Sequence, residues 1–111
     1  MQYLMLVCTD TAPDTDNAPA PDIDRWVAEN DGAGRRLMGS ELAPAATATT
    51  VRVRDGQVLL TDGPFAETKE LICGFDLLEC ADLDEAIAVA QAHPMARYGR
   101  LELRPLVTAQ P

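Results

Sequence analysis

The sequence predicts an α+β fold, a ferredoxin-like plait with an extra β-hairpin, in a single domain that spans residues 1–111. Three observations predict this fold. The segments follow the order strand, helix, hairpin, strand, helix, strand, each expected helix has one apolar side, and the two longest strands are apolar on both faces. The length of 111 residues, with 47% hydrophobic residues, suits one globular domain with a modest core.

The N-terminal part predicts a strand, a loop and a helix. Residues 3–8 are a short continuous apolar run, which is typical of a buried strand. Prolines and aspartates fill residues 9–21, so we expect a solvated loop there. The carboxylate of Asp22 is expected to cap a helix over about residues 22–36, with Trp26 on its apolar side.

The middle of the chain predicts a β-hairpin. Residues 37–46 contain a glycine and a proline and are predicted to be a connector. Residues 49–54 then alternate in the manner of a half-exposed strand. Asp55-Gly56 is a strong two-residue turn signal, and residues 57–61 form the expected return strand.

The C-terminal part predicts a strand, a helix and a last strand. A long strand is expected over about residues 70–80. Asp82 and Glu85 stand in capping-box positions at the start of the second helix, and Pro94 ends it. Residues 100–104 alternate as the final strand.

Both expected central strands are apolar on their two faces. In the first strand, one face holds Tyr3, Met5 and Val7 and the other holds Leu4, Leu6 and Cys8. In the long strand, one face holds Leu71, Cys73, Phe75 and Leu77 and the other holds Ile72, Gly74, Leu78 and Cys80. Two helices cover only one face of a sheet, and each large side chain left in water forgoes roughly 1.5–3 kcal/mol of burial. We therefore expect an obligate homodimer, packed sheet to sheet about a two-fold axis as a barrel-like sandwich.

Charge and composition exclude several functions. The chain has 9 Lys and Arg against 18 Asp and Glu, a net charge of −9. Such a surface repels nucleic-acid phosphates and anionic lipids, so we expect no direct nucleic-acid binding and no membrane binding. No apolar run approaches the roughly 20 residues that span a bilayer, and the N-terminus lacks signal-peptide features. We expect a cytoplasmic protein.

No metal site or cofactor site is predicted. The chain has an odd number of cysteines, namely Cys8, Cys73 and Cys80. They form no CxxC motif and lie in apolar stretches, so we expect buried, reduced thiols. No cluster of histidines and carboxylates suggests a metal, and no glycine-rich loop is typical of dinucleotide or phosphate binding.

A nine-residue string carries a resemblance to a known family. Residues 62–70, Asp-Gly-Pro-Phe-Ala-Glu-Thr-Lys-Glu, resemble the signature of the DGPF family, a branch of the YCII-related proteins. Residues 48–52, Gly74-Phe75, residues 84–86 and residues 102–105 also fit, so the resemblance covers nearly the whole chain.

The resemblance implies a dimeric α/β barrel and no settled activity. Similar proteins in the wider superfamily include muconolactone isomerases and heme-free monooxygenases, which have a pocket between sheet and helices. YCII-type proteins carry a His/Asp pair near the first helix, but the single histidine here is His93. Genes of DGPF proteins often lie beside those of extracytoplasmic-function sigma factors, which implies a stress-response context.

The signature loop is the first candidate site. As a purely structural element, it is a rigid connector that satisfies its own backbone, with Phe65 anchored in the core. As a binding element, Asp62, Phe65, Glu67, Thr68 and Lys69 line the mouth of a pocket and orient a polar small molecule or shuttle protons.

Two titratable residues outside the loop are further candidates. His93 is expected at a helix C-terminus, where the dipole favours the imidazolium and the side chain caps free carbonyls, or else it acts as a general acid/base. Asp76 interrupts an apolar face and needs a partner, for which Arg104 and Arg52 are the candidates. We expect Asp76 to be part of a structural ion pair, or to act as a general base if it faces a cavity and its own pKa is raised. Arg104 is also a candidate ligand-binding residue.

The leading hypothesis is a small dimeric protein with a small-molecule pocket beside the Asp62–Lys69 loop and no cofactor. One alternative is an acid/base enzyme, isomerase-like or resembling a cofactor-free oxygenase, with Asp62, Asp76 or His93 as the proton-transfer group. Another is a regulator that binds a protein through an exposed apolar patch.

Overall fold

The computed structural model describes residues 1–63 and 71–108. In chain order the elements are β1 (Gln2–Thr9), α1 (Ile23–Gly32), β2 (Arg36–Glu41), a short 3₁₀ turn (Ala45–Thr47), β3 (Thr49–Arg54), β4 (Gln57–Asp62), β5 (Ile72–Glu79), α2 (Leu83–Gln91), α3 (Met95–Tyr98) and β6 (Gly99–Pro105).

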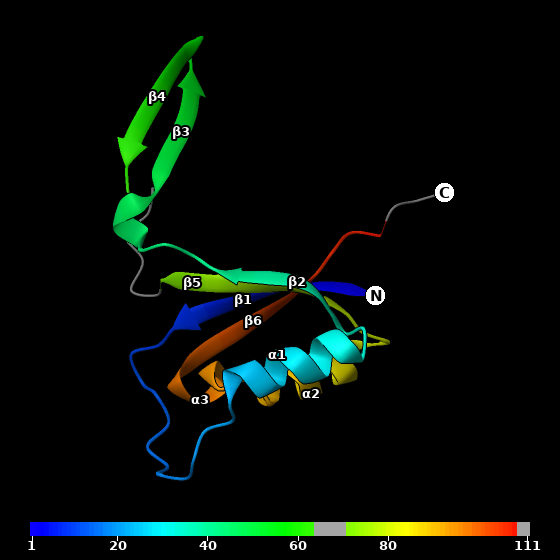
Figure 1. Ribbon diagram of the computed structural model, residues 1–111. Coiled ribbons are helices and arrows are strands. Elements are labelled where there is room, and N and C mark those ends of the chain that lie inside the picture. Colours follow the sequence, from blue (N-terminus) through cyan, green and yellow to red (C-terminus); the bar gives the residue numbers. More distant parts are fainter. Residues whose placement is uncertain (64–70, 109–111) are drawn as a thin grey trace.

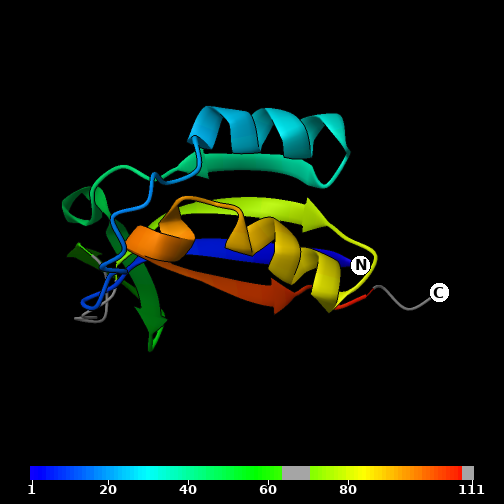
Figure 2. The same ribbon diagram turned by 90° about the horizontal axis from the view of Figure 1, so that it is seen from below.

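Four of the strands form one antiparallel sheet in the order β2-β5-β1-β6. The two strands that follow no helix, β1 and β5, lie in the centre, and the strands after the helices lie at the edges. Helices α1 and α2 cover one face of the sheet (Figure 1), with α1 over the β2 side and α2 over the β6 side (Figure 2). The α+β class is confirmed, and the arrangement is compatible with a ferredoxin-like plait.

The core lies between the sheet and the helices. Its buried members are Tyr3, Met5 and Val7 of β1, Trp26 of α1, Leu78 of β5, Cys80, and Ala86, Val89 and Ala90 of α2. The alternating residues of β1 therefore face the helices as a set, and small alanines on α2 let that helix approach the sheet closely.

Strand β2 is a correction to the sequence prediction. We expected a helix over residues 22–36 and a connector over 37–46, but α1 ends at Gly32 and residues 36–41 pair with β5. Gly34 has a φ of +73°, the left-handed conformation that ends helices. The chain therefore turns early enough for Arg36 to begin an edge strand.

The predicted hairpin is present but belongs to a different sheet. Strands β3 and β4 pair only with each other, and the turn residues Asp55 and Gly56 have φ values of 51° and 74°, as a type I′ turn requires. We call residues 49–62 the arm. It rises from the body on the side opposite the helices (Figure 1). The edge place next to β5 is taken by β2, which makes the hairpin an addition to the plait, as predicted.

The helix boundaries follow their capping residues. The carboxylate of Asp22 accepts a bond from the Asp24 N–H, and that of Asp82 accepts one from the Glu85 N–H at 2.9 Å. Glu85 in turn accepts a bond from the Ala81 N–H, which completes a box-like cap. Helix α2 ends at Gln91, just before Pro94, so these sequence predictions are confirmed.

The loop between β1 and α1 is tied to α3. Asp14 accepts a bond from Arg97 Nε at 3.1 Å, and its backbone N–H donates to the Arg97 carbonyl. The hydrogen bond that the Asp16 backbone N–H donates, and after it the one from Arg97, lowers the pKa of the Asp14 carboxyl. This loop is solvated, as predicted, yet it has a fixed attachment point.

The second face of the sheet carries apolar side chains on β1, β2 and β5, and the charged side chains of Arg100, Glu102 and Arg104 on β6. We call it the open face and define it by Leu4, Leu6, Met38, Ile72, Phe75 and Leu77, which the strand register places on the side opposite Tyr3 and Met5. A bulge in β5 puts Ile72 opposite Cys8, so Ile72 lies on this face and not beside Gly74 and Leu78 as predicted. Within the described residues, Met38 is 54% exposed and Ile72 is 49% exposed. In the same part of the chain, no helix is long and apolar enough to cross a lipid bilayer.

Candidate functional site

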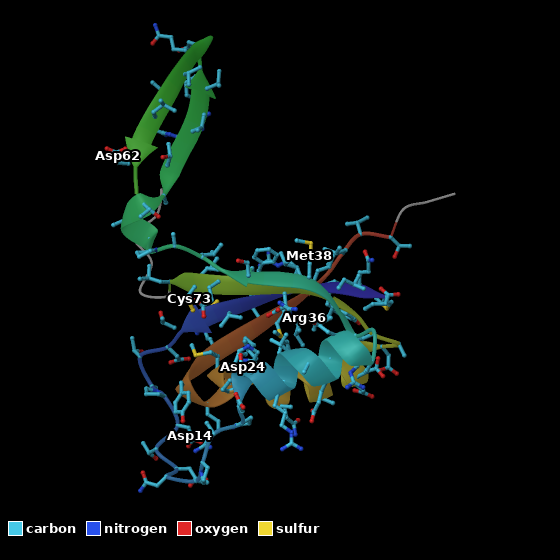
Figure 3. The ribbon with its side chains drawn as sticks, viewed as in Figure 1. Asp14, Asp24, Arg36, Met38, Asp62 and Cys73 are labelled. Atoms are coloured by element: carbon cyan, nitrogen blue, oxygen red, sulfur yellow. The ribbon has the colours of Figure 1, made fainter. Side chains whose placement is uncertain are left out.

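A cavity of about 550 Å³ lies between the sheet and the helices. Its lining is mostly apolar and comes from α1, β2, β5 and the junction of α2 and α3. The lining residues used below are Trp26, Val27, Arg36, Glu41, Cys73, Asp76 and His93. Figure 3 shows Arg36 between the sheet and α1, toward the helices. The volume falls within the range of small-molecule sites in proteins.

A buried ion pair forms the polar centre of this cavity. Asp76 of β5 points to the helix side, and its Oδ1 accepts a bond from Arg36 Nε at 2.7 Å. The Arg36 Nη1 also donates to Asp31, at the end of α1, at 2.9 Å. The side chains of Asp76 and Arg36 are only 9% and 15% exposed. The pair therefore connects α1, β2 and β5 at the wall of the cavity.

Gly39 makes room for this pair. It lies opposite Asp76 across the β2–β5 ladder. A Cβ atom at this position would collide with Asp76 Oδ1 and would lie 2.8 Å from Arg36 Nη2. Only glycine therefore leaves space for the carboxylate and the guanidinium beside the β2 backbone.

Burial controls the ionisation of Asp76. Removal from water raises the pKa of the Asp76 carboxyl, and the hydrogen bond and charge of Arg36 oppose this shift without cancelling it. The Asp76 hydrogen bond is also the main reason that the pKa of Arg36 is raised. Oδ1 is the carboxylate oxygen that binds Arg36, which leaves Oδ2 as the second acceptor of Asp76.

His93 lines the same cavity as a neutral imidazole. Its ring is 5% exposed, and burial lowers its pKa. Nδ1 accepts a bond from the Met95 N–H at 2.9 Å, so the neutral ring carries its proton on Nε2. The sequence favoured a charged ring that caps free carbonyls. That prediction is wrong, because the ring serves as the acceptor that starts α3 and its burial opposes the helix dipole.

Trp26 holds the imidazole in place. The two rings meet edge to face with their centroids 4.6 Å apart. The indole Nε1 donates to the Val89 carbonyl at 2.9 Å, which fixes the tryptophan against α2. The indole of Trp26 therefore connects the His93 ring to the backbone of α2.

The predicted partners of Asp76 are wrong. Arg104 pairs with Leu4 in the register, so its side chain is on the open face, where it binds Glu102 at 2.8 Å. Arg52 lies on β3, in the arm. The partner is Arg36, which sequence reasoning missed because it placed this residue in a helix. The glycines that follow Asp31 carried the signal for an earlier helix end.

The structure brings together two of the three candidate proton-transfer residues. Asp76 and His93 line one cavity, whereas Asp62 ends β4 on the arm (Figure 3). The remaining loop candidates, Phe65, Glu67, Thr68 and Lys69, lie outside the described residues.

The three thiols are free, as predicted. Cys8 and Cys80 are buried, and burial raises the pKa of both thiols. Cys73 is half-buried at the cavity wall, and its Sγ lies 3.4 Å from the Val7 carbonyl. Among the described residues, no group of three or more histidine, cysteine or acidic side chains is placed to hold a metal ion.

Comparison with known proteins yields a family. The sequence model of the YCII-related domain matches residues 1–109. An uncharacterized protein of Rhizobium meliloti (strain 1021) is 42% identical over 83 residues, a stretch that covers 71% of this chain. The match covers 65% of that relative, so the chain spans a little less than two thirds of the relative's length.

Proposed function

The chain belongs to the YCII-related domain family, and on this premise we propose that it is a homodimer that binds a small, largely apolar molecule in the cavity between its sheet and its helices. The observation that carries the proposal is the cavity itself, an apolar space of about 550 Å³ with a buried Arg36–Asp76 pair at its wall. Apolar pockets with a few convergent polar groups are the usual form of small-molecule sites.

The charges at the cavity favour a neutral or cationic ligand. Arg36 is the positive group of the lining, and its Nε and Nη1 donate to Asp76 and Asp31. Asp76 and Glu41 are the acidic members, and His93 is neutral. An anionic ligand would meet this net negative lining, in which the one cation among the described lining residues already pairs with two carboxylates.

The open face supports the homodimer. The register places Leu4, Leu6, Phe75 and Leu77 on the face opposite Tyr3 and Met5. The helices cover the other face of the sheet (Figure 1). A second copy packed face to face would remove these side chains from water and would produce the dimeric α/β barrel expected from the sequence. With a net charge of −9 on each copy, burial of apolar surface is the force that favours this association.

Ligand binding is tested with the fluorescence of Trp26, the single tryptophan of the chain. Benzylamine, benzyl alcohol and benzoate share one ring and differ in charge. We expect saturable quenching by the amine and the alcohol and none by benzoate. Equal quenching by all three, without saturation, would show collision with an accessible indole and would contradict the proposal.

Two α1 variants locate the binding. Val27 lines the cavity and Ala28 beside it is exposed, so Val27→Phe fills the space and Ala28→Phe adds the same ring outside it. We expect Val27→Phe to abolish the saturable quenching and Ala28→Phe to retain it, with unchanged far-ultraviolet circular dichroism. Retained binding in both variants would place the ligand elsewhere.

One observation favours a second function, proton transfer at carbon. Asp76 has a raised pKa and His93 a lowered one, and both line the same cavity. Titratable groups with displaced pKa values that line one cavity are candidates for acid/base chemistry. In such a reaction the Asp76 carboxylate takes a proton from the carbon next to a carbonyl, and the Nε2–H of His93 donates a hydrogen bond to the developing oxyanion.

Deuterium exchange tests this second function. Cyclohexanone in D₂O is a neutral apolar probe whose α-hydrogens exchange once an enolate forms. We expect the protein to accelerate the exchange, Asp76→Asn to abolish the acceleration and Asp31→Asn to retain it, because Asp31 touches Arg36 and does not line the cavity. No acceleration by the unmodified protein would remove the catalytic proposal and leave the binding proposal to the fluorescence test.

A further inference from the structure

One face of the arm is apolar and exposed. In the β3–β4 register, Val51 is opposite Leu60 and Val53 is opposite Val58, so these side chains share one face. They are 60%, 67%, 55% and 63% exposed, respectively. A contiguous patch of large aliphatic side chains on a projecting element is typical of an interaction surface.

Within residues 1–63 and 71–108, the arm pairs with no strand of the main sheet. A two-stranded hairpin alone is marginally stable in water, and β3 and β4 form a sheet apart from the main one. The radius of gyration is 16.4 Å, whereas about 13 Å is expected for a compact domain of this length. The shape of one copy therefore leaves the arm in need of a second surface.

A hollow lies between the open face and the segment that leads to the arm. The arm rises on the side of the sheet that the helices leave open (Figure 1). The hollow has a volume of about 720 Å³. Leu6 and Ile72 of the open face line it, and so do Leu42 and Ala48 of the segment that leads to the arm. Arg100, Glu102 and Arg104 of β6 also line this hollow, so its apolar part is the side formed by the open-face residues and the segment that leads to the arm.

We propose that the arm is a clasp for a second copy of this chain. When the partner is seated on the open face, the arm of each protomer lays Val51, Val53, Val58 and Leu60 against the flank of the other. Both surfaces are present on every copy, so a two-fold axis makes the contact reciprocal and closes the assembly at two. The inference rests on the proposed homodimer and adds to it a second, separate contact region.

The choice of a second copy follows from charge and position. The arm face is uncharged from Val51 to Leu60, and Asp62 lies on the same face at its base, so the outer part of the face suits apolar contact between two chains that each carry a net charge of −9. The open face, with its own unpaired apolar area, lies directly beside the arm. An unrelated partner would have to cover both surfaces at once, whereas a copy of the chain brings a matching arm and a matching sheet.

The test compares two charges placed on neighbouring residues of β4. Leu60→Asp puts a carboxylate on the apolar face of the arm, and Thr61→Asp puts the same charge on the opposite face. Sedimentation equilibrium gives the dimer dissociation constant of each variant. Because each substitution acts twice in a symmetric dimer, we expect Leu60→Asp to raise this constant by about 100-fold and Thr61→Asp to leave it within about threefold.

The outcomes separate the clasp from the homodimer. If the unmodified protein is a monomer at micromolar concentration, the homodimer and the clasp are both wrong. If it is a dimer and Leu60→Asp dissociates no more easily than Thr61→Asp, the clasp is wrong and the sheet-to-sheet dimer stands. Leu60→Thr, which keeps β-propensity and adds no charge, should weaken the dimer about tenfold and guards against misfolding of the charged variant.

Discussion

Arg36 is the residue whose removal tests the buried pair most sharply. In Arg36→Met the methionine replaces the aliphatic stem of arginine but offers nothing to the carboxylate. Asp76 then stays buried, with a side chain 9% exposed, and loses the partner that binds it at 2.7 Å. Breaking a buried pair in this way costs about 3–5 kcal/mol of the free energy of unfolding at neutral pH.

The cost depends on pH in a defined direction. Burial already raises the Asp76 pKa above its ordinary value of 3.8, and Arg36 opposes that rise, so its removal raises the pKa further. In the folded Arg36→Met variant, the Asp76 carboxyl then holds its proton more tightly than it does in the unfolded chain. The stability that this proton provides is present at low pH and is lost as the pH rises through the folded pKa. The deficit of Arg36→Met is therefore largest near pH 7 and shrinks toward about pH 4.

Urea unfolding at one fixed protein concentration, near pH 7 and near pH 4, measures this deficit. Arg25→Met is the matched control, because Arg25 is paired with Glu29 on the surface and its side chain is 79% exposed. We expect the control to leave stability nearly unchanged at both pH values. A deficit below about 1 kcal/mol for Arg36→Met near pH 7, or an equal deficit at both pH values, would refute the account of the pair.

Three further predictions concern Gly39, His93 and the thiols. Gly39→Ala should lower the free energy of unfolding, measured in urea, by about 1–3 kcal/mol, because the added Cβ meets the Asp76 carboxylate. Gly32→Ala is the control and should not lower it, because no atom lies within 4 Å of the added Cβ. Equal effects of the two substitutions would contradict the packing at β2. The single histidine allows an NMR titration, in which the pKa of His93 should lie below its ordinary value of 6.5. The free energy of unfolding should fall as the pH drops from 6.5 to this lower pKa, because in that interval the unfolded chain binds the proton and the folded chain does not. A titration midpoint at or above 6.5 would argue against the buried neutral ring. With a thiol reagent near pH 8, Cys8 and Cys80 should react far more slowly in the folded protein than in urea, because burial raises the pKa of both; equally fast labelling in the two states would show that they are exposed.

Sequence patterns predicted the elements that have local signals. The apolar run over residues 3–8 lies in β1, the Asp55-Gly56 turn makes the hairpin, and Asp82 with Glu85 starts α2. Each of these depends on residues close together in sequence. Their preferences act through neighbouring backbone groups, so the tertiary structure reinforces them instead of overriding them.

Strand β2 had no such local signal. Its residues 36–41 do not alternate in polarity, because an edge strand with a bulge has little burial to impose a pattern. It forms because β5 offers a free ladder edge and because Asp76 attracts Arg36. Both causes involve residues that are far apart in the sequence, so local sequence patterns do not indicate them.

The candidate site was predictable in part for the same reason. Asp76 was identified as a buried carboxylate in need of a partner, since a charge within an apolar strand is visible in the sequence. Its true partner and the space that Gly39 provides depend on the β2–β5 register. The proximity of His93 depends on how α2 packs against Trp26, which periodicity alone does not specify.

The central claim is that the apolar open face requires a second copy of the chain. Sedimentation equilibrium of the unmodified protein at micromolar concentration tests it most directly. We predict a mass near 24 kDa, twice the 12.0 kDa of one chain, and a shift toward 12.0 kDa for Leu6→Asp on the open face. A mass of 12.0 kDa for the unmodified protein would contradict the claim.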